Sequence, residues 1–124
     1  MTLQELYVSI GEDYELAIRV LRVEKLVDKH IRKLTRNGVI ENLLEAGKTM
    51  DAAQLFEAAH AAKGNCGYLG LTRLAEACSE IAEEYRPSKS RSMTDEEVAE
   101  KLREIARLYE ETADAIRWYE ADNP

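Results

Sequence analysis

Apolar residues recur along the chain at intervals of three and four, the spacing that places side chains on one face of an α-helix. No segment of useful length alternates apolar and polar residues as a strand would. The clearest helical pattern follows a capping-box sequence at Thr94 and Glu97, and its inward positions are Val98, Leu102, Ile105, Tyr109, Thr112, Ile116 and Tyr119. This pattern predicts an all-α fold.

Glycines and capping residues divide the first part of the chain into short helical segments. An opening helix should end at Gly11, and Asp13 can cap a segment that either continues or bends before Asn37 and Gly38. The apolar residues after Gly38 predict a further short helix that Gly47 closes. The N-terminal part is therefore expected to contribute short helices.

Longer helices are predicted in the second part of the chain. Asp51 is the expected N-cap of a helix that runs into a glycine-rich stretch, and its core-facing residues should be Leu55, Phe56, Ala59 and Ala62. The next helix should begin near Leu71 and stop before Pro87, which cannot donate a backbone hydrogen bond. Because the loops are short, we expect an antiparallel four-helix bundle with additional short N-terminal helices, in a single domain spanning residues 1–124.

The composition and net charge of the chain indicate which partners it has and where it is located. The 124 residues are 45% hydrophobic and 33% charged, enough to build a core and cover a helical surface. A net charge of −7, with no Lys/Arg stripe interleaved with aromatics, argues against nucleic-acid binding. No basic start precedes an apolar run, and no stretch is long enough for a membrane span. We expect a cytoplasmic monomer with protein partners, in which Cys66 and Cys78 are reduced packing residues.

A histidine, a lysine and two glycines share one predicted helix face. His60, Lys63, Gly64 and Gly67 stand at positions i, i+3, i+4 and i+7 of a continuous helix. Each glycine inside a helix costs about 0.8–1 kcal/mol relative to alanine, so the pair sacrifices roughly 2 kcal/mol of helix stability. Two explanations stay open: the glycines clear an exposed face for a partner protein, or they allow two helices to pack closely.

The chemistry of this face suits transfer of a phosphoryl group to the histidine. An imidazole is largely neutral at about pH 7 and can act as a nucleophile without a separate base. Lys63, one turn from His60, could neutralise the phosphoryl oxygens, and the glycines would let a partner bring the group in line. His30 has no acidic or nucleophilic partner at useful spacing, so we expect it to be a surface residue without a role.

A metal enzyme is a weaker interpretation of the same histidine. Glu57 and His60 form one Glu-x-x-His pair, of the kind that di-iron bundles use on two of their helices. The second pair is missing, because Val27 lies three residues before His30. A phosphate-binding glycine loop of an NTP-dependent kinase is also missing. We therefore expect no metal site and no cofactor.

The run around His60 resembles the histidine motif of the histidine phosphotransfer (HPt) domain family. That motif is H-x-x-K-G with another glycine six residues after the first, here His60, Lys63, Gly64 and Gly70. The resemblance spans the whole chain. It implies a phosphoryl-carrying intermediate of a multistep phosphorelay, not a self-sufficient enzyme. His60 would exchange the group with a histidine kinase or the receiver-domain aspartate of a response regulator, and the partner would supply magnesium.

One position departs from the family pattern. Some members of the family place a glutamine on the next helix, where it hydrogen-bonds the other imidazole nitrogen, and Ala82 stands at that position here. Glu83 or a water molecule could substitute for the glutamine. The departure leaves a second interpretation open, a non-relaying interaction module that docks receiver or kinase domains without transferring phosphoryl groups.

Overall fold

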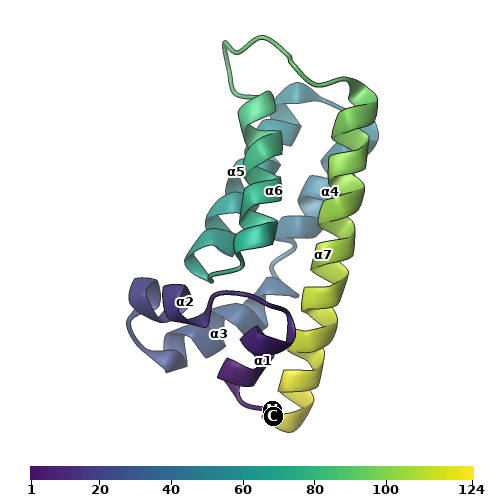
Figure 1. Cartoon of the computed structure of the whole chain (residues 1–124). Coiled ribbons are helices and arrows are strands. Elements are labelled where there is room, and N and C mark those ends of the chain that lie inside the picture. Colours follow the sequence, from purple (N-terminus) through teal and green to yellow (C-terminus); the bar gives the residue numbers. More distant parts are fainter.

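The computed structural model describes all 124 residues and is built from helices alone, as the sequence predicts. The seven helices are α1 (Leu3–Ser9), α2 (Tyr14–Leu21), α3 (Glu24–Leu34), α4 (Val39–Thr49), α5 (Ala52–Tyr68), α6 (Thr72–Glu84) and α7 (Asp95–Asp122). Helices α4 to α7 run alternately up and down as a four-helix bundle, and α1 to α3 lie at one end of it beside the second half of α7 (Figure 1). The bundle with additional N-terminal helices is thereby confirmed.

One hydrophobic core of 29 buried residues runs through the bundle and the N-terminal helices. Helix α7 begins with the predicted capping box: the Thr94 hydroxyl accepts a hydrogen bond from the Glu97 amide at 3.1 Å, and the Glu97 carboxylate accepts one from the Thr94 amide at 2.9 Å. Its core-facing residues include Val98, Ile105 and Ile116, all fully buried. No helix has both the length and the apolar character that crossing a membrane requires.

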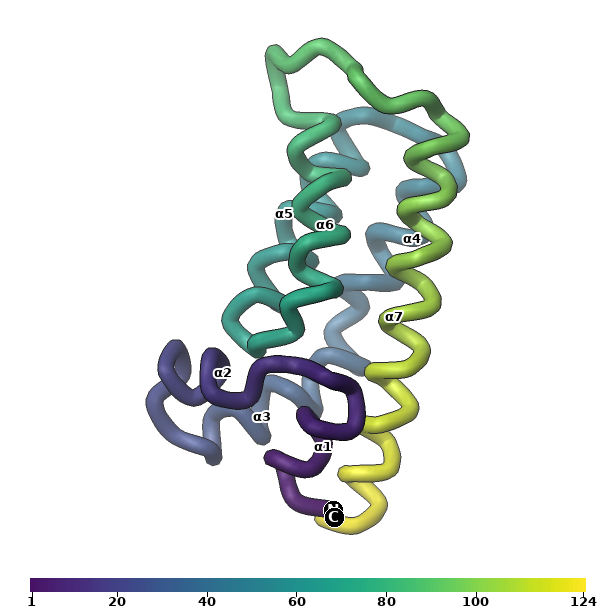
Figure 2. Tube along the Cα trace, viewed as in Figure 1, coloured from purple at the N-terminus to yellow at the C-terminus, as the bar shows by residue number.

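The two ends of the chain meet at the far end of α7, as the trace in Figure 2 shows. The Met1 amino group lies 2.5 Å from a carboxylate oxygen of Asp122, and the Asn123 side-chain amide donates to the Met1 carbonyl at 2.7 Å. Arg36, just after α3, forms an ion pair with Glu120 of α7. These contacts fix the N-terminal helices against α7.

The prediction that Gly47 closes a helix is wrong. Helix α4 continues to Thr49, and Met50 takes the left-handed conformation that ends it, with φ of 58°. A Cβ atom on Gly47 would lie 2.5 Å from Cδ1 of Leu102 in α7. The glycine therefore permits α4 and α7 to approach closely and does not terminate the helix.

Helices α2 and α3 form a projecting pair, which we call the arm, and it bends at Arg22. Arg22 has φ of 79°, so the segment that was expected either to continue or to bend does bend, and α2 ends there. The base of the arm joins the α5–α6 turn, where the Asp13 amide donates to the Gly70 carbonyl at 3.0 Å. Gly70 has φ of 68°, and a Cβ on it would lie only 2.1 Å from the Asp13 carbonyl oxygen. Glycine is therefore required at this junction by conformation and by space.

A buried carboxylate at the end of α6 holds the loop that leads to α7. Glu84 accepts hydrogen bonds from the Ser92 amide at 2.9 Å, the Met93 amide at 2.8 Å and the Arg91 guanidinium at 2.8 Å. Lys89 adds an ion pair at 3.3 Å. The backbone donor from Met93 contributes most, and together these donors hold the pKa of Glu84 well below its usual range. The sequence pattern did not single out this residue.

Candidate functional site

Helix α5 carries the predicted site and runs without interruption through both glycines. Its N-cap is Asp51, as predicted, whose carboxylate accepts a hydrogen bond from the Gln54 amide at 2.9 Å. The face directed at the core is fully buried and consists of Leu55, Ala59, Ala62 and Cys66. Because those residues fix the rotation of the helix, His60 and Lys63 are turned outward and exposed.

The two exposed polar side chains make no interactions within the chain. Neither the His60 imidazole nor the Lys63 ammonium group takes part in a hydrogen bond or an ion pair to another residue of the structure. A Cβ atom at Gly64 or at Gly67 would meet no atom within 4 Å, so no neighbouring helix uses the space beside these glycines. Close helix packing therefore does not account for them, and the face along His60 is open.

The aromatic ring of Phe56 lies against the imidazole of His60. Phe56 is only partly buried, and its ring stacks on the His60 imidazole with centroids 5.7 Å apart and planes inclined by 21°. Phe56 packs against the core, as expected, but it is less buried than Ala59 and also contacts His60. The spacing of four residues between Phe56 and His60 carries the signal for this contact.

No side chain of α6 supplies the polar contact that a glutamine would make. Ala82 is buried, with 5% of its surface exposed, and has no polar side-chain atom. Glu83 is paired instead with Arg86 at 2.8 Å. The stacked Phe56 ring therefore contacts the imidazole of His60 where no polar side chain of the chain does.

His30 lies at the surface, as expected, but its ring contacts another side chain of the chain. It is half-buried, and its ring meets the Tyr68 ring edge to face, with centroids 5.6 Å apart and an angle of 86°. Nearby, the Asn37 side chain donates a hydrogen bond to Asn65 at 3.2 Å. These two contacts attach the arm and the residues after it to the C-terminal half of α5.

Both cysteines are buried, as expected for packing residues. Burial raises the pKa of the Cys66 thiol and brings the pKa of Cys78 to about 12, so neither is poised to react as a thiolate. No group of three or more histidine, cysteine, aspartate or glutamate side chains is placed to hold a metal ion.

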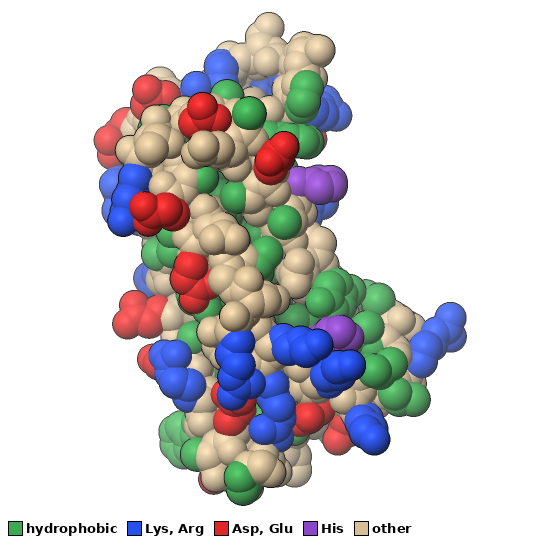
Figure 3. All heavy atoms as spheres, turned by 180° about the vertical axis from the view of Figure 1, so that it is seen from behind, with side chains coloured by type: hydrophobic (Ala, Val, Ile, Leu, Met, Phe, Trp, Pro, Cys, Tyr) green, Lys and Arg blue, Asp and Glu red, His purple; other side chains and the backbone are tan.

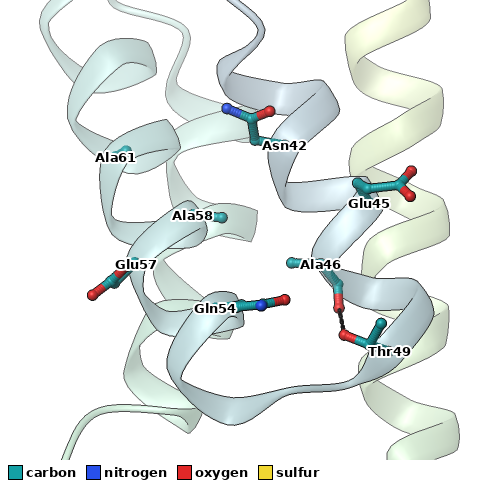
Figure 4. A pocket seen from close by; sticks show the side chains of 8 residues that line it. All are labelled: Asn42, Glu45, Ala46, Thr49, Gln54, Glu57, Ala58 and Ala61. Carbon is teal, nitrogen blue, oxygen red and sulfur yellow. Dashed lines mark hydrogen bonds between the residues drawn. The ribbon is translucent and has the colours of Figure 1, made fainter.

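A groove between α4 and α5 lies next to the exposed face (Figure 4). It has a volume of about 470 Å³ and is lined by Asn42, Glu45, Ala46, Thr49, Gln54, Glu57, Ala58 and Ala61. In the close view, Gln54 reaches from α5 toward α4, whereas Glu57 points away. The histidine itself is not in this groove but on an open surface, where a second protein has access to it.

The sequence of this chain is similar to one known family of domains. Residues 28–115, more than two thirds of the chain, match the family model of the Hpt domain. Neither the curated proteins nor the solved structures contain a match. Hpt domains carry phosphoryl groups on histidine in phosphorelays, where they interact with histidine kinases and receiver domains, and they are generally carriers and not enzymes. The helical bundle and the match together show that this chain belongs to the Hpt domain family.

Proposed function

We propose that His60 accepts a phosphoryl group from the aspartyl phosphate of a receiver domain or from a histidine kinase, and passes it to a receiver aspartate. The observation that carries this proposal is the exposed imidazole on an open helix face, with unoccupied space beside Gly64 and Gly67. A neutral imidazole nitrogen attacks phosphorus, an N–P bond forms, and the P–O bond to the aspartyl group breaks. The carboxylate leaves with the bonding electrons, and a ring proton can pass to solvent.

Lys63 has a stabilising role in this proposal. It lies one turn from His60, is exposed, and is not engaged by any carboxylate of the chain. Its ammonium group is therefore free to approach the phosphoryl oxygens as their charge redistributes. Phe56 would act as a positioning residue, because stacking limits the rotation of the imidazole while leaving its edge open.

The test uses the two histidines of the chain as a matched pair. Purified wild type, His60→Gln and His30→Gln are incubated with phosphorylated receiver domains, and label that is acid-labile and base-stable is followed. We expect label on wild type and on His30→Gln but none on His60→Gln. Since His60 is exposed, its substitution should shift stability by no more than about 0.5 kcal/mol. Label that persists on His60→Gln refutes the assignment.

A second candidate function is a non-relaying module that docks receiver or kinase domains. The observation in its favour is that His60 receives no hydrogen bond from the chain and that Ala82 offers none. This candidate predicts that receiver domains bind to the wild type and to His60→Gln alike, while no competent donor labels either protein. Labelling of wild type followed by onward transfer to a receiver excludes it.

A further inference from the structure

The arm is strongly basic in a chain that is acidic overall. Residues 14–36, which are the arm and the two residues after it, contain three acidic side chains and seven basic ones, a formal charge of +4 against −7 for the whole chain. The basic residues are Arg19, Arg22, Lys25, Lys29, Arg32, Lys33 and Arg36. The net charge of the chain conceals this local reversal of sign.

Most of these cations have no partner within the chain. Arg32 pairs with Asp28 and Arg36 with Glu120. The other five are exposed and form no ion pair, and they are Arg19, Arg22, Lys25, Lys29 and Lys33. Arg19 and Lys33 stand in the last turns of α2 and α3, where a cation is favourable to the helix dipole, but no carboxylate of the chain pairs with any of the five.

Arg22 stands at a position where the backbone conformation disfavours an arginine. Its φ of 79° lies in the region that favours glycine, and a non-glycine residue there is strained by about 1–3 kcal/mol. The arginine side chain makes no hydrogen bond or ion pair that offsets the strain. The contacts of the folded chain therefore do not explain why an arginine stands at this position.

The same part of the arm exposes aliphatic side chains. Five large hydrophobic residues of the chain are exposed, and three of them are close together here: Val20 at 47%, Val23 at 51% and Leu26 at 39%. Figure 3 shows the face with both histidines, where lysine and arginine side chains gather over the part that the arm occupies, with hydrophobic side chains beside them. Apolar residues ringed by charge are typical of protein interaction surfaces.

The arm lies within reach of a partner that covers His60. Tyr68, which contacts His30 of the arm, is eight residues from His60, or about 12 Å along the helix at 1.5 Å per residue. A typical interface buries about 800 Å² on each partner, which corresponds to a disc with a radius of about 16 Å. A protein centred on His60 with such a footprint therefore extends over Tyr68 to the end of the arm that carries His30.

We propose that the arm is a second docking surface for the receiver domain, and that it selects receivers with an acidic, partly apolar surface beside their phosphorylation pocket. This inference rests on the proposed relay function. The family match begins at residue 28, so Arg19, Arg22, Lys25 and the three exposed aliphatic residues lie outside the matched segment. A receiver is favoured over an anionic membrane because the arm shares its face with His60, which a membrane would cover.

Charge reversal tests the proposal with a control of equal net charge. The test variant is R19E/K25E/K29E, and the control is R103E/R107E/R117E on α7. The control arginines are exposed, and α7 is diagonally opposite α5, since both helices pack chiefly on α4 and α6. Unlike the arm cations, the control arginines pair with carboxylates of α7, so thermal melts must first show that both variants are folded.

The readout is binding of receiver domains activated with beryllofluoride, in the wild-type and His60→Gln backgrounds. We expect the arm variant to bind about tenfold more weakly than the control at about 0.1 M salt, where charges interact over about 10 Å. The difference in affinity between the two variants should disappear at about 1 M salt, where charges interact over only about 3 Å. Val23→Asn should weaken binding at both salt concentrations.

The outcomes separate this proposal from the proposed function. Equal binding by the arm and control variants, or receivers that do not bind wild type, overturns the arm proposal whatever happens at His60. Arm-dependent binding without any labelling of His60 would retain the docking surface and refute the relay. Arm-dependent binding to vesicles of phosphatidylcholine and phosphatidylglycerol, with unchanged receiver binding, would assign the arm to a membrane surface and overturn the proposal.

Discussion

Replacing the glycines beside His60 by alanine should stabilise the protein while impairing transfer. Gly64 and Gly67 have ordinary helical backbone conformations, and a Cβ on either meets no atom within 4 Å. Each substitution should therefore recover the helix propensity of about 0.8–1 kcal/mol without steric loss. For a chain of this size, about 4 °C per kcal/mol predicts a gain of about 7 °C in Tm for the double variant.

The same substitutions act in the opposite direction on phosphoryl transfer. Side chains one turn apart have Cβ atoms about 5–6 Å from each other, so a residue at position 64 stands directly beside His60. Since a misplacement of about 1 Å can slow a reaction about 100-fold, Gly64→Gln should slow transfer by about that factor, and Gly64→Ala by less. Single-turnover transfer from a phosphorylated receiver measures the rate, and thermal melts measure stability.

Gly70→Ala provides the control for a glycine that the fold requires. Gly70 has a positive φ, and an added Cβ would lie 2.1 Å from the Asp13 carbonyl oxygen. Gly70→Ala should therefore lower Tm, whereas the alanine substitutions beside His60 should raise it. Wild-type transfer by Gly64→Gln would refute the access argument. A fall in Tm for Gly64→Ala would show that the glycine has a structural role that the open space beside it does not suggest.

Four further predictions concern single residues. Phe56→Leu should slow transfer about 3-fold, because about 0.7 kcal/mol of ring stacking is lost, whereas Phe56→Tyr keeps the ring and should transfer at the wild-type rate. Equal transfer rates for Phe56→Leu and wild type would contradict a positioning role. Thr94→Ala should lower the free energy of unfolding by about 1 kcal/mol in urea titrations. Arg22→Gly should raise that free energy by about 1 kcal/mol, because strain is relieved; a decrease would refute the strain. Glu84 has a lowered pKa when folded, so its contribution is complete above its unfolded pKa of about 4.3 and is lost as the pH falls further. Glu84→Gln should lower Tm at pH 7 and flatten the acid dependence of Tm.

The parts of the fold that depend on local chemistry could be predicted from the sequence. The capping box at Thr94, the N-cap at Asp51 and the end of α6 before Pro87 each depend on residues within one or two turns. The prediction that Gly47 ends a helix was wrong because the glycine is needed for a contact that is distant in sequence, the close approach of Leu102. A glycine within a helical pattern fits both explanations until the packing partner is known.

The site shows the same division between local and non-local information. The spacing of His60, Lys63, Gly64 and Gly67 predicts a shared face, and the structure places them on one. The Phe56 contact could have been found from its spacing of four. Which helix packs beside the site is a tertiary property, so the contact of His30 with Tyr68 could not be derived from the sequence alone.

Access and selectivity make opposing demands on the surface around a phosphoryl-accepting histidine. Glycines that clear the face for a receiver also remove the side chains that could distinguish one receiver from another. Discrimination must then come from residues that are outside the cleared area but inside the footprint of the partner. The arm carries unpaired cations and exposed aliphatic residues and is joined to α5 next to the cleared area through His30 and Tyr68, whereas α7 is diagonally opposite α5. If the glycines provide access, selectivity should therefore follow the charge of the arm and not the residues next to His60.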